Sequence, residues 1–295
     1  MTDNNRLLRS VSVHGGHSGE FCNHALDALE DIVQAYIRKN FAWIGITEHM
    51  PPVSDKFVFQ EEADAGLDAK NMYQRFGQYI STCRELQKKY SRDIQIFVGF
   101  ETETCTGYKE HVHKLIQEFQ PDYIVGSVHH VDDMIIDATP ELFARAVDAS
   151  GGIDALYCRY FDQQYEMLNT LKPAVVGHFD LVRMFDADYF SRLEKPEIQK
   201  RIIRNLECIK GLDLVMDFNL RAFQKGASEP YISKNILVQA LELGIAVVPG
   251  DDSHGINTVG LDMEKGISLL YELGFDPCWR KPDNANSKSQ ITNSK

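Results

Sequence analysis

The stretch Ile94–His130, IQIFVGFETETCTGYKEHVHKLIQEFQPDYIVGSVHH, decides the fold of this chain. Its apolar runs, Ile94–Glu103 and Tyr123–His130, each have the length of one buried β-strand, and the segment between them reads as an amphipathic helix. A helix that connects two strands indicates that the strands pair in parallel. The stretch is therefore one β/α unit, and both of its strands end in histidine or glutamate.

The same alternation of short apolar runs and amphipathic stretches repeats along the rest of the chain. It predicts seven strands with mainly parallel pairing. The strands are expected at Leu7–His14, Ala42–His49, Ile94–Glu103, Tyr123–His130, Ala174–Asp180, Leu214–Asn219 and Ala246–Asp251. Each is followed by a predicted helix, such as Ala25–Lys39, in which Leu26, Leu29 and Ile32 share one face at spacings of three and four.

No Ser- and Gly-rich linker or change of composition divides the chain, so residues 1–281 are predicted to form a single domain. The segment Pro51–Gly66 is loop-like and acidic, which makes it a candidate flap over a site. Residues 282–295 are rich in Asn, Ser and Lys without an apolar pattern, and they predict a disordered tail.

The charge balance limits the partners of the protein. In 295 residues, 43 acidic side chains against 31 basic ones give a formal net charge of -12, which argues against nucleic acid or an anionic membrane as a partner. No apolar stretch approaches the roughly 20 residues that cross a bilayer, so a cytoplasmic protein is expected. Six scattered cysteines without a CxxC pair predict reduced thiols.

Histidines and acids recur at or just beyond the carboxyl ends of the predicted strands, which is where β/α barrels place their active sites. The strand ends carry His14-Gly15-Gly16-His17 followed by His24, then Glu48-His49, Glu101 with Glu103, Ser127-Val128-His129-His130, Gly177-His178-Phe179-Asp180 and Asp251-Asp252-Ser253-His254. One such histidine alone is more often a hydrogen-bonded structural residue than a ligand. Five histidine-bearing strand ends together indicate a metal site, because neutral imidazole and carboxylate are ligands of zinc, manganese and iron.

The number of candidate ligands indicates more than one ion. A single catalytic zinc takes three protein ligands and keeps an open position, whereas this set offers nine candidates, so two or three divalent ions (Zn, Fe or Mn) are expected. Glu101 is the best candidate for a carboxylate that bridges two metals. Glu103 points to the same side of its strand and could equally be a solvated or substrate-facing acid.

These residues resemble the histidinol-phosphatase branch of the polymerase-and-histidinol-phosphatase (PHP) family over nearly the whole chain. The matching motifs are Phe21-Cys22-Asn23-His24-Ala25, Ile46-Thr47-Glu48-His49-Met50-Pro51, Gly99-Phe100-Glu101, Gly126-Ser127-Val128-His129, Gly177-His178-Phe179-Asp180-Leu181, Asp217-Phe218-Asn219, Glu229-Pro230-Tyr231 and Gly250-Asp251-Asp252-Ser253-His254. The resemblance implies a distorted seven-stranded β/α barrel with a trinuclear metal centre. It also implies hydrolysis of L-histidinol phosphate, a small-molecule phosphate ester, in histidine biosynthesis.

The resemblance distributes the metal ligands over three ions. His14, His17, Glu101 and Asp252 would surround the first ion; Glu101, His129 and His178 the second; and His24, His49 and His254 the third. Of these, Glu101, Asp252 and His254 are also expected to be catalytic.

The first motif departs from the family pattern, which has one residue between its two histidines. His14 and His17 are separated by Gly15-Gly16, a spacing that requires a bulge or the end of the regular strand. Two glycines make such a distortion inexpensive. His14 is therefore kept as a ligand, with a position behind the ligand shell as the alternative.

The expected mechanism is in-line attack on phosphorus by a metal-activated hydroxide. Arg183 and Arg221, which follow the fifth and sixth strands, are expected to bind phosphate, because guanidinium donates two hydrogen bonds at once. Asp180 and Asp251 are candidates for the general acid or for orienting ligand histidines, and Glu48 is open to the same readings.

Four further residues near the motifs or in the intervening helix are expected to have no part in the chemistry. Cys22 and His130 are expected to serve packing, and His111 and His113 to be solvated on a helix. Two rival functions stay open: hydrolysis of another small phosphate ester, such as a nucleotide or sugar phosphate, and a catalytically silent metal-binding module.

Overall fold

The computed structural model describes residues 9–282, so the predicted tail lies outside the described residues except for Pro282. Seven strands form one parallel sheet in the order β1-β2-β3-β4-β7-β8-β9. They are β1 Val11–Ser12, β2 Trp43–Ile46, β3 Gln95–Glu101, β4 Tyr123–Gly126, β7 Val175–Val176, β8 Val215–Asn219 and β9 Ala246–Gly250. The seven predicted strands are thus confirmed, with shorter bounds than expected over the described residues; Leu7 and Leu8 of the first predicted strand lie outside them.

The first and last strands approach one another and nearly close the sheet into a barrel. The backbone amide of Val13 donates to the carbonyl of Pro249 at 2.9 Å, and the amide of Asp252 donates to the carbonyl of His14 at the same distance. The predicted β/α barrel is therefore confirmed. Its closing bonds lie next to two predicted metal-binding strand ends.

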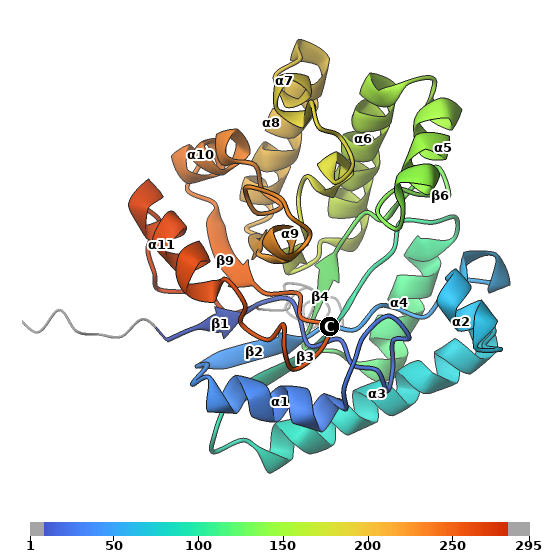
Figure 1. The fold of residues 1–295 in the computed structure, drawn as a ribbon, viewed down its shortest axis with the longest axis vertical. Helices are drawn as coiled ribbons and strands as arrows, with labels where there is room; N and C mark the ends of the chain where they lie inside the picture. The colour runs from blue at the N-terminus through green and yellow to red at the C-terminus, as the bar shows by residue number, and fades with distance from the viewer. Residues whose placement is uncertain (1–8, 283–295) are drawn as a thin grey trace, which may run out of the picture.

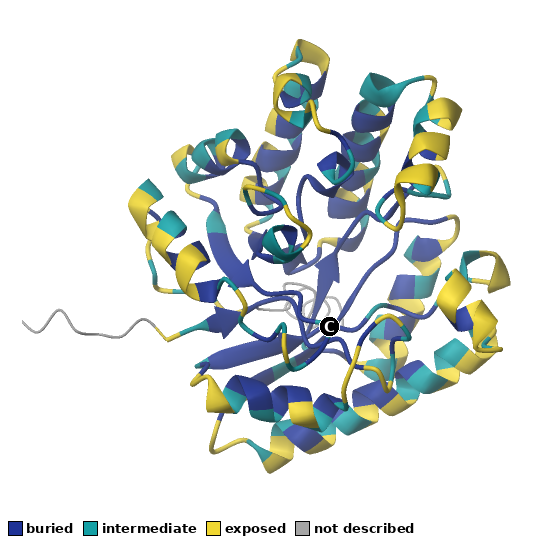
Figure 2. Cartoon of the chain, in the orientation of Figure 1, coloured by how far each residue is buried: buried dark blue, intermediate teal, exposed yellow. Residues whose placement is uncertain are grey.

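Helices surround the strands (Figure 1). They are α1 Leu29–Arg38, α2 Gln60–Asp64, α3 Ala69–Lys89, α4 Tyr108–Phe119, α5 Pro140–Ser150, α6 Ile153–Leu171, α7 Tyr189–Leu193, α8 Pro196–Gly211, α9 Arg221–Gln224, α10 Lys234–Glu242 and α11 Met263–Leu273. A two-stranded hairpin, β5 His130–Val131 with β6 Met134–Ile135, projects from the barrel. The strands are buried, whereas the helices expose their outer faces (Figure 2), which explains the continuous apolar runs of the strands. No helix within residues 9–282 is long and apolar enough to cross a bilayer.

The first helix is shorter than the expected Ala25–Lys39, because it begins at Leu29. The amide of Leu26 donates instead to the carbonyl of His254 at 2.8 Å, and Glu20 Oε2 accepts from the amide of Leu29 at 2.7 Å. The expectation that Leu26 lies on the buried face is wrong, since this side chain is 69% exposed. The segment before the helix is therefore tied to the last strand-end loop, and it carries His24 there.

The predicted flap, Pro51–Gly66, is more ordered than a loop. It contains the 3-10 helix η1, Asp55–Phe57, and the short helix α2. Backbone and side-chain contacts of α2 with Asn23 hold it beside the His24 segment: Glu62 Oε1 lies 3.4 Å from the Asn23 amide, and the Glu61 carbonyl accepts from Asn23 Nδ2 at 3.3 Å.

Candidate metal centre

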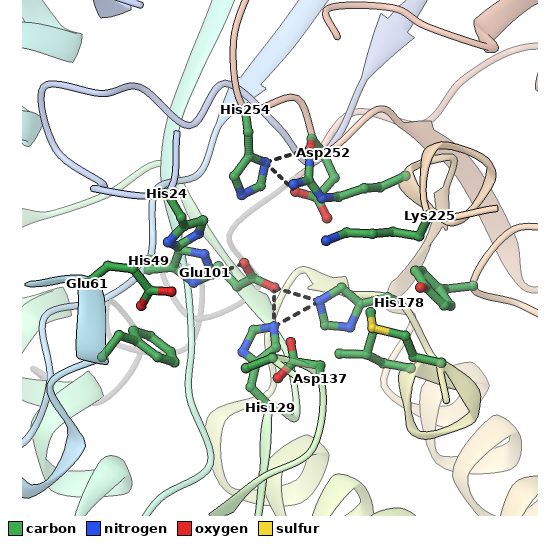
Figure 3. A pocket seen from close by; sticks show the side chains of 16 residues that line it. His24, His49, Glu61, Glu101, His129, Asp137, His178, Lys225, Asp252 and His254 are labelled. Atoms are coloured by element: carbon green, nitrogen blue, oxygen red, sulfur yellow. Dashed lines mark hydrogen bonds and ion pairs between the residues drawn. The ribbon is translucent and has the colours of Figure 1, made fainter. Parts of the chain in front are cut away.

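Glu101, at the carboxyl end of β3, lies at the middle of a histidine cluster. Its Oε1 lies 2.8 Å from His178 Nε2 and 3.2 Å from His129 Nε2. Its Oε2 lies 3.2 Å from His14 Nε2 and 3.4 Å from His49 Nδ1. Each carboxylate oxygen thus faces two imidazole nitrogens from different strand ends, the arrangement expected of a carboxylate that bridges metal ions. Figure 3 shows Glu101 with the rings of His129 and His178.

The remaining predicted ligands lie on the other side of His14 and His49. His17 Nε2 lies 3.4 Å from Asp252 Oδ1, and the rings of His17 and His254 stack with centroids 4.2 Å apart. The ring of His24 lies 5.1 Å from that of His254 and 5.3 Å from that of His49. The structure therefore brings together all nine side chains that the sequence singled out.

Several subsets of this cluster have ligand atoms close enough to share one ion. They are His14 with His17 and Asp252, His14 with Glu101 and His178, His17 with His49 and His254, His49 with Glu103 and His129, and Cys22 with His24 and His49. The subsets overlap, and His49 belongs to three of them. The division of ligands among three ions consequently stays a prediction.

Whether the ring nitrogens of the cluster have hydrogen-bond partners indicates whether these residues fit metal ions. His14 Nε2, His17 Nε2 and His49 Nδ1 are buried and have no hydrogen-bond partner. Leaving such a polar atom unpaired in the interior costs about 1–3 kcal/mol. His14 Nε2 and His49 Nδ1 face Glu101, and His17 Nε2 faces Asp252. Cations at these positions would satisfy the unpaired nitrogens, so the donor set fits divalent metals of the zinc, iron or manganese type.

A second set of carboxylates orients three of the histidines by contacting Nδ1, the ring nitrogen that faces away from the cluster. His14 Nδ1 lies 2.9 Å from Asp217 Oδ2, His17 Nδ1 lies 3.0 Å from Glu48 Oε1, and His129 Nδ1 lies 2.9 Å from Glu103 Oε2. A histidine that donates Nδ1–H to a carboxylate presents Nε2 to a metal with a fixed ring orientation and higher basicity. Each of these three histidines therefore presents Nε2 to the cluster.

These contacts correct three expectations about acids. Glu103 is not solvated, because its side chain is buried beneath His129 and His130. Asp180 accepts from Ser233 and Arg183, and Asp251 accepts from Ser12 and Tyr36, so neither orients a ligand histidine. The sequence motif gave Asp217 no role; its position on a buried strand, two residues before Asn219, was the signal that could have revealed it.

Burial and charge act in opposite directions on the pKa values of the cluster. Burial alone would lower the pKa of His17, but the carboxylates of Glu48 and Asp252 raise it to about 9. Burial opposes ionisation of Glu101, yet His14 and His129 hold its pKa well below the usual range. For His24, burial and the neighbouring His49 and His17 lower the pKa to about 3. Metal ions would therefore displace protons from some of these imidazoles on binding.

The glycine pair explains the unusual spacing of His14 and His17. Regular strand ends at Ser12, and Gly16 has a φ of +78°, so the chain turns between the two histidines. A Cβ on Gly15 would lie 2.5 Å from Asp251 Oδ1, and one on Gly16 would lie 2.5 Å from Ile46 Cδ1. Both histidines reach the cluster because these two positions have no side chain, which favours the interpretation of His14 as a ligand over a position behind the shell.

A cavity of about 250 Å³ opens beside the cluster and is lined by Glu101, His129, His178, Asp252 and His254, among others. Arg221 and Lys225 contribute cationic groups to its wall, and the Arg221 guanidinium donates to the carbonyl of Asp252 at 3.0 Å. Phe59 and Glu61 of the flap also line it. Arg221 therefore lines the cavity, and its role in phosphate binding stays a prediction; Lys225 was not predicted.

Arg183 does not line this cavity, which corrects the expectation that it binds phosphate. Its guanidinium is buried, donates to Asp180 and to the carbonyls of Glu229 and Pro230, and packs 5.1 Å from the centroid of the Tyr231 ring. Since Tyr231 does line the cavity, we expect Arg183 to position Tyr231 instead.

Four residues outside the predicted ligand set have clear positions. The Cys22 thiol is buried 3.2 Å from the His24 ring, and burial raises its pKa well above the usual range, which does not favour a nucleophilic thiolate. His130 packs against Phe57 and Phe59 and contacts Glu103. His113 is exposed, as expected, whereas His111 is half-buried, with Nε2 2.9 Å from the carbonyl of Pro51.

A nearly closed parallel barrel with a cluster of histidines and carboxylates at the carboxyl ends of its strands defines a class of metal-dependent β/α-barrel enzymes. Within that class, the chain belongs to the PHP domain family, whose model matches residues 15–220.

Curated relatives and solved structures agree with this assignment. A protein of Schizosaccharomyces pombe named "Probable histidinol-phosphatase" is 33% identical over 90% of this chain and 87% of its own length. The histidinol-phosphatase of Saccharomyces cerevisiae is 30% identical over 88% of each chain.

Among solved structures, a candidate histidinol phosphatase of Listeria monocytogenes has a TM-score of 0.77 and 26% identity, with 87% of this chain and 99% of that one covered. The histidinol phosphate phosphatase of Lactococcus lactis, solved with zinc, L-histidinol and phosphate, has a TM-score of 0.69 and 19% identity, with 91% and 95% covered. At that identity the second likeness shows the fold alone.

Proposed function

We propose that this chain is a metal-dependent phosphomonoesterase that hydrolyses L-histidinol phosphate to L-histidinol and phosphate in histidine biosynthesis. The observation that carries the proposal is the convergence of nine histidines and carboxylates, several with unpaired buried nitrogens, beside an open cavity with cationic groups. The names of the relatives that match nearly the whole chain supply the substrate. Two or three zinc, iron or manganese ions, and a cytoplasmic location, remain predictions.

Different residues are proposed to bind the metal ions and to bind the phosphate. Bound divalent ions would lower the pKa of a coordinated water to about 7 and neutralise negative charge on the phosphoryl oxygens. Glu101, Asp252 and His254, the predicted catalytic residues, would hold the ions in place with the six other ligands. Arg221 and Lys225 would draw the phosphate dianion into the cavity and fix its orientation, so that attack occurs in line.

A phosphate-release assay on the metal-loaded protein tests the proposal. We expect kcat/KM for L-histidinol phosphate to exceed that for a sugar phosphate and a nucleoside monophosphate by at least about 10-fold. The variant Glu101→Gln should lose activity and metal, because the bridging carboxylate becomes a neutral amide. Glu272→Gln is the matched control, since Glu272 is exposed on α11, away from the site.

The same experiment separates the rival functions. Equal efficiencies for all three esters would replace the specific assignment with a general small-molecule phosphatase. Bound metal without hydrolysis of any ester would identify a silent metal-binding module and would overturn the proposal.

A further inference from the structure

The cavity wall contains acidic groups that neither the metal ions nor a phosphate requires. Asp137, in the segment between β6 and α5, lines the cavity, and Glu61 of α2 lines it from the flap. Figure 3 shows Glu61 and Lys225 on opposite sides of the cavity, with Asp137 beside His129. Asp137 belongs to none of the groups of described side chains that are close enough to share an ion.

Asp137 lies close enough to His129 and Lys225 for its charge to act on both, but it is not hydrogen-bonded to either. Among residues 9–282, no hydrogen bond or ion pair involves its carboxylate, although the side chain is only half-exposed. Glu61, by contrast, is exposed and can be hydrated by bulk water. A half-buried carboxylate that lies near a phosphate site, with no hydrogen bond or ion pair to neutralise it, repels a ligand that carries only negative charge.

We infer that Asp137 binds a cationic group of the substrate, so that the site takes a zwitterionic amino-alcohol phosphate with its phosphate toward Arg221 and its ammonium toward Asp137. This inference rests on the proposed function and deepens it. In L-histidinol phosphate the ammonium lies two carbons from the ester oxygen, so its partner must lie close to the metal centre. The position of Asp137 beside His129 satisfies this condition. A sugar phosphate or a nucleotide carries no such ammonium, and Asp137 would exclude both.

Three substrates test the assignment in wild type and in Asp137→Asn. They are L-histidinol phosphate, imidazolylpropyl phosphate, which lacks the ammonium, and p-nitrophenyl phosphate, which lacks the ammonium and has a good leaving group. We expect Asp137→Asn to lower kcat/KM about 10- to 100-fold for L-histidinol phosphate, mainly through KM, as for a lost charge-assisted hydrogen bond. The ratio of kcat/KM between L-histidinol phosphate and imidazolylpropyl phosphate should fall by the same factor, with metal content unchanged.

Each other outcome overturns the inference in a distinct way. A loss shared by both alkyl esters and absent for p-nitrophenyl phosphate would make Asp137 a general acid. An equal loss for all three esters, or a loss of metal, would give it a structural or ligand role. The variant Glu61→Gln is the matched comparison. If kcat/KM for L-histidinol phosphate alone fell in Glu61→Gln and did not fall in Asp137→Asn, the ammonium would bind at the flap instead. Failure of the wild type to hydrolyse any ester would instead refute the proposed function.

Discussion

His14 and Asp217 show how one buried residue orients another. With Asp217 Oδ2 at 2.9 Å from His14 Nδ1, the imidazole keeps its Nε2 free and directed at Glu101. Asp217 is fully buried, and Asn219 Nδ2 donates to the same oxygen at 3.0 Å. The orientation of His14 therefore depends on a carboxylate from the opposite part of the sequence.

The variant Asp217→Asn tests this dependence. We expect affinity for the metal, or kcat/KM, to fall about 10- to 100-fold, because the amide lacks the negative charge that raises the basicity of His14. Metal titration against a competing chelator, together with steady-state kinetics, measures the effect. Asp213→Asn is the control, since Asp213 is exposed and pairs with Arg280 away from the site. Unchanged affinity in Asp217→Asn would contradict the orienting role.

At the scale of single residues, the sequence predicted the candidate ligands better than their surroundings. His49, Glu101 and His178 stood out because histidines and acids recur together at several strand ends, whereas a single one would have indicated little. The contacts of Arg183 and the position of Asp137 could not be predicted in the same way. They depend on how the loops after the strands fold back over the barrel, and a loop has no periodic pattern that reveals its neighbours.

The elements of the barrel are irregular where they carry the site. β1 ends at Ser12, and β4 ends at Gly126, before His129. Both strands were predicted to extend to a histidine, because apolar residues continue in the sequence beyond the last residue that pairs with the neighbouring strand. The residues that follow each strand turn inward and no longer pair with the neighbouring strand. Burial on both faces therefore predicted that each strand exists, but it did not predict where the strand ends.

The turn after β1 gives a prediction about Gly16. Gly16 and Gly66 have nearly equal positive φ angles, +78° and +77°, but only at Gly16 would a Cβ meet a neighbour within 4 Å. Gly66→Ala should therefore destabilise the protein by only about 1 kcal/mol, the conformational cost alone. Gly16→Ala should cost about 1–3 kcal/mol more, because Ile46 must move. Urea denaturation of both variants measures the difference, and equal losses would show that the turn accommodates a side chain.

At the scale of the whole molecule, the site joins six of the seven barrel strands, all except β8. Its predicted ligands follow strands from β1 to β9 and include His24 before α1. Metal binding should therefore stabilise the entire fold. At a free metal concentration of about 1,000 times Kd, one site contributes about 4 kcal/mol to the free energy of unfolding.

Removal of the metal tests this coupling. After chelation and dialysis, we expect the Tm to fall by several degrees, at about 2–4 °C for each kcal/mol lost. Phosphatase activity should disappear in parallel. Zinc or manganese should restore both, whereas magnesium should not, because imidazole ligands suit it poorly. Differential scanning calorimetry with elemental analysis measures the change, and an unaltered Tm after complete removal of metal would refute the coupling.

The bonds between the β1 and β9 ends, Val13 to Pro249 and Asp252 to His14, have a consequence for biosynthesis on the ribosome. Asp252 and His254 are the last of the proposed ligands to be synthesised, so a nascent chain cannot assemble the full ligand set before both have left the exit tunnel. Until then the earlier histidines and Glu101 face one another without the residues that complete their coordination. The complete set of proposed ligands can therefore form only after the loop that follows β9 has been synthesised, and the same loop supplies one of the bonds that close the barrel.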